Sequence, residues 1–157
     1  MLRKRKNKRV TKVLAVASEG GHWVQLMRLK PAFDKYSTTY VSTNPGLKDA
    51  YGCDEFKLVR DANLNKKLSL ILSALEIFFL VLRERPTHVI STGAAPGFLS
   101  IVWGKIFGAK TIWIDSIANA EELSAAGKRV KWFADHWLTQ WPELSGDAGP
   151  IYKGRVL

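Results

Sequence analysis

Short apolar segments rich in β-branched residues alternate with helical segments along most of the chain. Strands are predicted at about 12–17, 38–43, 55–59, 87–92, 110–115 and 136–140. Helices are predicted from the turn after the first strand to Phe33, and at 68–82, 96–107 and 130–134. Strands that alternate with helices form a parallel sheet with right-handed crossovers. The sequence therefore predicts an α/β fold with a Rossmann-like parallel sheet flanked by helices.

The turn after the first strand contains Gly20, Gly21 and His22. Glycines allow positive φ and let a ligand approach the backbone closely. The helix that follows presents free N–H groups and the positive end of its dipole, which suit a phosphate or a developing oxyanion. His22 is the side chain of this turn that exchanges a proton near neutral pH. The alternative is purely structural: a tight connection in which the histidine caps the helix.

Two later turns follow strands in the same way. Thr92, Gly93, Ala94 and Pro96 come at the end of one strand, and Asp115, Ser116 and Asn119 at the end of the next. Ligands of open parallel sheets bind beyond the carboxyl ends of the strands. The three turns are therefore expected to meet along one edge of the sheet.

The chain carries 24 Lys and Arg against 14 Asp and Glu, a formal net charge of +10. Seven of the basic residues lie within the first twelve positions, so residues 1–11 are predicted to form a basic arm before a single domain at 12–157. Such an arm binds nucleic acid or anionic lipid, or is a solvated terminus. The single cysteine, Cys53, excludes an internal disulfide framework. The histidines are scattered, and no metal site is expected.

The segment Leu68–Leu82 is apolar on nearly all sides, with a thin polar stripe at Ser69, Ser73 and Glu76. It is shorter than the roughly 20 residues that span a bilayer. Such a helix is either buried in the core or in contact with a membrane surface or a partner. Basic residues on both sides and the basic arm favour the membrane. The predicted contact residues are Leu72, Leu75, Phe78, Phe79 and Leu82.

The tryptophans are expected to serve packing and interfaces. Trp103, Trp113 and Trp132 are predicted in the core, whereas Trp23 and Trp141 are candidates to face a sugar or a partner.

Three motifs in this order, Glu19–His22, Ser91–Pro96 and Ile112–Ser116, resemble one family. The chain looks like the acceptor-side half of split glycosyltransferases, over about residues 12–145. These are the ALG fourteen-like proteins of asparagine-linked glycosylation and the PssD-like proteins of bacterial capsule and exopolysaccharide synthesis. It also resembles, more distantly, the N-terminal domain of MurG.

The resemblance implies the N-terminal half of a GT-B glycosyltransferase, which binds a lipid-linked acceptor and recruits a catalytic partner chain. The partner would supply most of the nucleotide-sugar site, and no cofactor is implied beyond that donor. ALG fourteen-like proteins carry an N-terminal transmembrane helix, whereas this sequence shows a basic arm. It is therefore expected to be cytoplasmic and to meet an anionic membrane peripherally, at the cytoplasmic face.

Inverting sugar transfer needs a base for the acceptor hydroxyl and donors for the departing diphosphate. His22 is the first candidate base, and Asp115 is the second or the group that orients the histidine. The remaining turn residues are candidates for substrate binding, through backbone groups or polar side chains: Gly20, Gly21, Thr92, Gly93, Ala94, Pro96, Ser116 and Asn119.

Three other functions compete with this hypothesis. The chain could be a non-catalytic membrane anchor or scaffold for a catalytic subunit, or a small nucleotide-dependent enzyme complete in itself. It could also be a nucleic-acid-binding α/β protein that uses its basic arm. We expect no nucleic-acid partner, because the basic residues do not alternate with aromatic residues on a sheet face.

Overall fold

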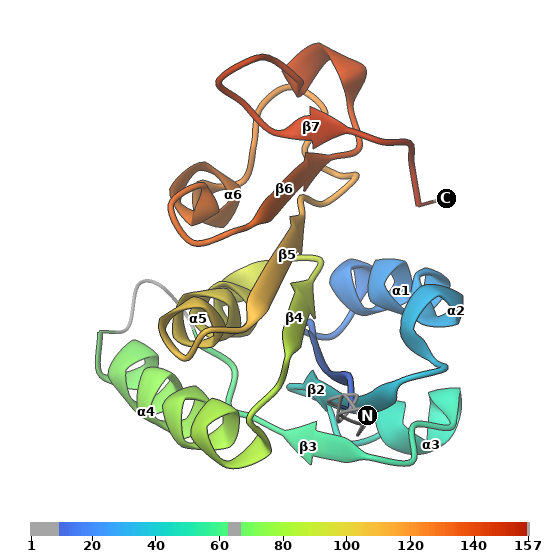
Figure 1. Cartoon of the computed structure of the whole chain (residues 1–157), viewed down its shortest axis with the longest axis vertical. Helices are drawn as coiled ribbons and strands as arrows, with labels where there is room; N and C mark the ends of the chain where they lie inside the picture. Colours follow the sequence, from blue (N-terminus) through green and yellow to red (C-terminus); the bar gives the residue numbers. More distant parts are fainter. Residues whose placement is uncertain (1–9, 63–66, 157) are drawn as a thin grey trace, which may run out of the picture.

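The computed structural model describes residues 10–62 and 67–156, which form a seven-stranded sheet in the order β3-β2-β1-β4-β5-β6-β7 (Figure 1). The strands are β1 (Lys12–Val16), β2 (Ser37–Ser42), β3 (Phe56–Leu58), β4 (His88–Ser91), β5 (Lys110–Ile114), β6 (His136–Thr139) and β7 (Ile151–Tyr152). Every neighbouring pair is parallel. The predicted parallel α/β fold is confirmed.

Helices cover both faces of the sheet. They are α1 (Gly21–Arg28), α2 (Lys30–Phe33), α3 (Leu47–Tyr51), α4 (Lys67–Glu84), α5 (Ala94–Ile106) and α6 (Ala125–Val130), with a 3₁₀ turn, η1, at Pro142–Leu144. In Figure 1, α4, α5 and α6 lie on one side of the sheet, and α1, α2 and α3 on the other. The chain therefore runs outward from β1 in both directions, as in a doubly wound sheet.

Alternate side chains of the central strands enter two separate cores. Leu14, Val16 and Trp113 are buried beneath the helices on the α5 side. Val13 and Ala15 are buried together with residues of α1 and α2. Burial on both faces explains why these strands are continuously apolar rather than alternating in polarity.

Several predicted elements differ from the structure. The helix predicted at 130–134 is instead α6, because the Ser124 hydroxyl accepts a hydrogen bond from the Gly127 N–H and starts the helix earlier. Residues 131–133 form a turn. The short elements α3 and β7 were not predicted. The first helix stops at Arg28, and α2 restarts with Pro31 in its first turn.

Two tryptophans are the reverse of what was predicted. Trp23 is fully buried and packs edge-on against Tyr40, Tyr51 and Phe56. Trp132 is 76% exposed in the turn after α6. The sequence alone does not show whether a tryptophan is buried or exposed, because its large apolar ring and its N–H group suit both the core and the surface.

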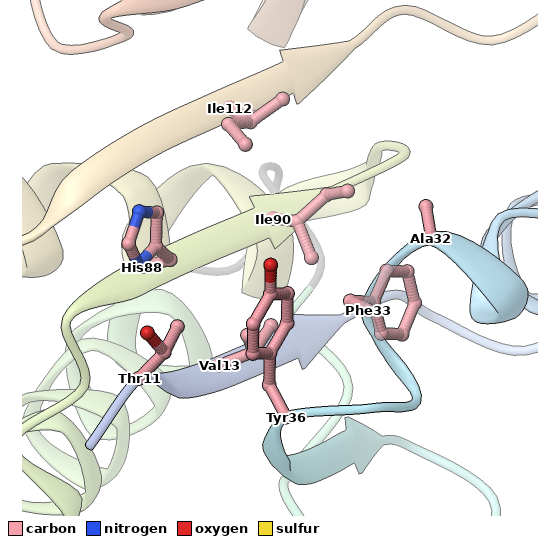
Figure 2. Close-up of a pocket in the computed structure, with 8 residues that line it drawn as sticks. All are labelled: Thr11, Val13, Ala32, Phe33, Tyr36, His88, Ile90 and Ile112. Carbon is pink, nitrogen blue, oxygen red and sulfur yellow. The ribbon is translucent and has the colours of Figure 1, made fainter.

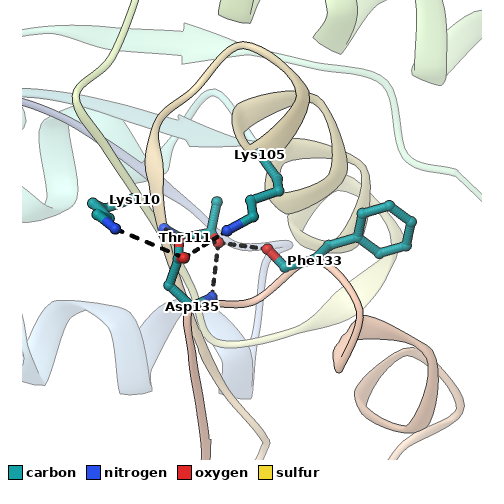
Figure 3. Close-up of polar contacts among 5 residues, drawn as sticks. All are labelled: Lys105, Lys110, Thr111, Phe133 and Asp135. Atoms are coloured by element: carbon teal, nitrogen blue, oxygen red, sulfur yellow. Dashed lines mark hydrogen bonds and ion pairs between the residues drawn. The ribbon is translucent and has the colours of Figure 1, made fainter.

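The amino end of β5 is tied to its neighbours by Asp135 (Figure 3). Its carboxylate accepts hydrogen bonds from the backbone N–H and hydroxyl of Thr111 and pairs with Lys105 at the end of α5. Burial acts to raise the pKa of Asp135, but these bonds outweigh it and lower the pKa to about 2. The ion pair therefore helps to fix the end of the sheet that lies opposite the carboxyl ends of the strands.

Helix α4 has its polar stripe turned inward. Ser73 is fully buried, the Ser69 hydroxyl donates to the carbonyl of Asp61, and the Glu76 carboxylate accepts the Arg60 N–H. The outward side is apolar, with exposed side chains at Leu68, Ile71, Leu72, Leu75, Phe79 and Leu82. An ordinary amphipathic surface helix has the opposite orientation, with its polar side toward solvent.

Phe78, the remaining predicted contact residue of α4, is only half-buried. Its ring packs against Phe79, Trp103 and Phe107. Among the helices of the described residues, none, α4 included, is both long and apolar enough to cross a bilayer. Residues 1–9 of the predicted basic arm lie outside the described part of the chain.

Candidate functional site

The three glycine- and serine-containing turns meet at the carboxyl ends of β1, β4 and β5, which are neighbours in the sheet. The first and second turns are joined by a reciprocal pair of hydrogen bonds. A ring nitrogen of His22, Nδ1, lies 2.9 Å from the carbonyl oxygen of Thr92, and the Thr92 hydroxyl donates to the carbonyl of His22 at 2.6 Å. The predicted meeting of these turns is confirmed.

The partner of His22 fixes its tautomer. A carbonyl oxygen only accepts hydrogen bonds, so Nδ1 carries the hydrogen and donates it to Thr92. In the neutral ring the lone pair is then on Nε2. The half-buried imidazole is thus held at Nδ1 by a backbone carbonyl, and Nε2 is the ring nitrogen that is able to accept a proton.

Gly93 permits this arrangement. It has φ 138° and ψ −172°, a conformation that side chains rarely adopt, and a Cβ added to it would lie 2.3 Å from Nδ1 of His22. Ala94 follows with φ 66°, although it is not glycine. Left-handed backbone at an alanine costs about 1–2 kcal/mol. Strain of this kind gathers at functional turns, so the segment 93–94 is a candidate ligand contact.

A buried amide network joins the first turn to the third, and sequence reasoning missed it. Gln25 of α1 donates to the carbonyl of Gly21 and to the hydroxyl of Ser116, and its own carbonyl accepts the N–H of Ile117. Gln140, after β6, donates to Gln25 and to the backbone carbonyl of Asp115. Both glutamine side chains are buried and bonded at both ends of the amide. They hold the turn of His22 against the ends of β5 and β6.

Asp115 is turned into the protein. Its buried carboxylate accepts hydrogen bonds from the indole of Trp113, the side chain of Asn119, and both the N–H and the hydroxyl of Ser124. A Cβ on Gly127 would lie 2.5 Å from this carboxylate, so α6 packs directly on it. Asp115 thus organises the loop between β5 and α6, and the group that orients His22 is Thr92.

The other predicted site residues take different positions. Gly20, with φ 77°, precedes α1, and positions for a Cβ on Gly20 and Gly21 face open space. Pro96 is buried in the first turn of α5, which begins two residues earlier than predicted. Ser116 and Asn119 bond within their own loop and to Gln25. Open space at the glycines leaves room for a ligand at the first turn.

A cavity of about 230 Å³ lies elsewhere, over the amino halves of β1, β4 and β5. Figure 2 shows Val13, Ile90 and Ile112 side by side across the three strands, with Phe33 and Tyr36 opposite them. The lining contains none of the predicted site residues. The chemistry of the three turns therefore has to be argued from their own geometry.

A comparison of sequences finds relatives from the family that the three motifs resemble, and a comparison of structures finds proteins with a similar fold. The chain is 25% identical to mouse "UDP-N-acetylglucosamine transferase subunit ALG14", over 93% of this chain and 83% of that protein. For human ALG14 the identity is 26%, over 92% of this chain and 82% of the relative. The resemblance to ALG14 is confirmed. No family model matches the chain.

Among solved structures, Acinetobacter baumannii MurG superposes with a TM-score of 0.74 at 9% identity, covering 91% of this chain and 45% of MurG. UDP-GlcNAc 2-epimerase from Neisseria meningitidis bound to UDP-GlcNAc gives a TM-score of 0.62 at 10% identity, covering 85% and 41% of the two chains. The chain spans less than half the length of these proteins. They establish the fold, that of one half of a GT-B enzyme.

Proposed function

We propose that this chain is the acceptor-binding subunit of a two-chain inverting glycosyltransferase. It would act with a catalytic partner on a nucleotide-sugar, UDP-N-acetylglucosamine by analogy with the name of its ALG14 relatives, and on a lipid-linked acceptor. Its place would be the synthesis of a polysaccharide or a lipid-linked oligosaccharide. The observation that carries the proposal is the His22–Thr92 pair at the carboxyl ends of the strands, in a chain similar in sequence to ALG14 and in fold to MurG.

His22 is the proposed base. Nε2 takes the proton of the acceptor hydroxyl while that oxygen attacks the anomeric carbon, and the bond from that carbon to the diphosphate breaks with the electron pair leaving on the nucleotide. Thr92 positions the ring through Nδ1. The free N–H groups at the starts of α1 and α5 suit the phosphates. Asp115 keeps a supporting role, because its carboxylate is engaged by its own loop.

The test compares two histidine variants in the complex reconstituted with the partner found by co-purification. His22→Ala should lower kcat by about 10²–10⁴-fold, the usual contribution of a general base. His136→Ala is the matched control, since this exposed histidine starts β6 at the opposite edge of the sheet. If kcat of His22→Ala is within a few-fold of that of the control, His22 is not the base, and the chain is better described as a non-catalytic scaffold.

We further propose that the outward face of α4 contacts an anionic membrane at its cytoplasmic side. Support comes from the inward polar stripe and the exposed Leu75 and Phe79, together with Lys67 and Arg83 near the ends of the helix. Each basic residue near anionic lipid contributes about 1 kcal/mol. The acceptor would then be collected from the same surface.

Vesicle flotation with a mixture of phosphatidylglycerol and phosphatidylcholine tests the membrane contact. Burial of one large apolar side chain is worth about 1.5–3 kcal/mol, so Leu75→Ser with Phe79→Ser should weaken binding at least tenfold. Val24→Ser, an equally apolar exposed site on α1, should have no effect. Deleting residues 1–9 or raising salt should also release the protein. Flotation of the double variant at the wild-type level contradicts the assignment.

A further inference from the structure

A second cavity, of about 150 Å³, opens between α4, α5 and α6. Its lining is apolar except for one guanidinium: Leu70, Ala95, Phe98, Leu99, Ala126 and Arg129. The ring of Phe98 is held edge-on against Phe133, with centroids 6.3 Å apart. The cavity is thus formed by side chains fixed on three helices.

The cavity lies between the candidate site and the outward face of α4. On one side, Ala95 follows two residues after Gly93, which adjoins the ring of His22. On the other side, Leu70 belongs to the first turns of α4, where Leu68 and Ile71 are 71% and 55% exposed. The cavity is therefore lined by a residue two positions from Gly93 and by a residue of α4 whose neighbours in the helix are exposed.

We propose that this cavity binds the first part of the hydrocarbon chain of a lipid-linked diphosphate, with Arg129 contacting the diphosphate. The inference rests on the proposed function, which requires such an acceptor. An apolar lining with a single cation matches a ligand that is apolar along its chain and anionic at one end. The occupant is the acceptor itself, because the cavity adjoins the turn at which transfer is proposed to occur.

Size and charge both fit this ligand. An apolar cavity of about 150 Å³ takes a benzene molecule, and one five-carbon isoprene unit is of similar size. A guanidinium binds phosphate oxygens in a bidentate manner. Among the described residues, the ion pairs involve Lys30, Lys105, Lys110 and Lys128 rather than Arg129. Its charge is therefore not already matched by a carboxylate of that part of the chain.

Methyl NMR of the full chain tests the proposal, with geranyl diphosphate as the probe and inorganic diphosphate as the comparison. Geranyl diphosphate should shift the methyl signals of Leu70, Ala95 and Leu99, whereas inorganic diphosphate should not. Ala126→Leu, which fills the cavity, should weaken binding at least tenfold. Ala125→Leu adds the same side chain one residue away, at an exposed position outside the lining, and should change it less than twofold.

Arg129 is tested separately, so that a folding defect at Ala126 does not decide the outcome. Arg129→Gln should weaken geranyl diphosphate binding several-fold, and Lys128→Gln, whose ammonium already pairs with Glu122, should not. Equal shifts from inorganic diphosphate, wild-type affinity in Ala126→Leu, or equal shifts from neutral phospholipid vesicles would each overturn the proposal.

The failure of this inference is distinguishable from failure of the proposed function. If the reconstituted pair transfers sugar and Ala126→Leu transfers it as well as wild type from a long-chain acceptor, the cavity assignment is wrong and the function stands. If the pair transfers no sugar to any lipid acceptor while geranyl diphosphate still binds as described, the function is wrong and the cavity remains a lipid-diphosphate site.

Discussion

The substitution Gly93→Ala tests whether the site depends on the position of the His22 ring. An added Cβ would lie 2.3 Å from Nδ1 and 2.4 Å from Cε1 of that ring, well inside contact distance. The ring has to move and give up its bond to the Thr92 carbonyl, a loss of about 0.5–1.5 kcal/mol. Backbone strain at this φ adds about 1–3 kcal/mol. We expect a destabilisation of about 2–4 kcal/mol.

Gly108→Ala separates the two contributions. Gly108 also has positive φ, 83°, but an added Cβ meets nothing within 4 Å, so only the backbone cost of about 1–2 kcal/mol remains. For a domain of this size 1 kcal/mol changes Tm by about 2–4 °C, so both variants are measurable by thermal unfolding.

Sugar transfer by the chain reconstituted with its partner then tests whether the position of the His22 ring matters for activity. Gly93→Ala should lose about 10²-fold or more in kcat, whereas Gly108→Ala should remain near wild type. Adding His22→Ala to Gly93→Ala should cost little more, because both changes remove the same group. Additive losses, or equal activity of the two glycine variants, would refute the reasoning.

Two further predictions concern stability. Gln25→Leu removes four side-chain hydrogen bonds and should destabilise the protein by about 2–4 kcal/mol, measured by urea unfolding; a loss below about 0.5 kcal/mol would mean that the network is not needed. The pKa of Asp135 is lowered, to about 2, so its contribution is complete above pH 4 and is lost as the pH falls from about 4 to 2. Because its side chain is 19% exposed, we expect the Asp135 carboxylate to stabilise the fold by about 1–2 kcal/mol. The difference in unfolding free energy between wild type and Asp135→Asn should therefore shrink as the pH falls over that range. A difference that stays constant would contradict this.

The strands and the long helices could be predicted from the sequence because their signals are local. β1, β4 and β5 are runs of apolar, β-branched residues, and their parallel pairing follows from the helices between them. α6 was misplaced because its start depends on Ser124 and on the buried carboxylate of Asp115, a contact formed only in the fold. α3 and β7 are too short to give a periodic signal.

The site was predictable as a set of turns but not as a set of contacts. The glycines, His22 and Asp115 could be assigned to turns that each follow a strand. This was enough to predict that the three turns meet at the carboxyl ends of the strands. It did not reveal that Thr92 orients His22, because the bond uses a backbone carbonyl. It also gave no sign of Gln25 and Gln140, which lie 115 positions apart and resemble ordinary surface residues in the sequence.

The orientation of α4 reverses the usual relation between exposure and tolerance to mutation. At most surface positions, replacing a leucine by a charged residue improves the solubility of the protein and has little effect on its fold or function. At Leu72 or Phe79 the same replacement would leave the folded core intact and yet separate the protein from the lipid that we propose it serves. A variant with charged residues introduced at these positions for solubility would be folded and stable in biophysical assays. Under the proposed function it would nevertheless fail to support sugar transfer at the membrane.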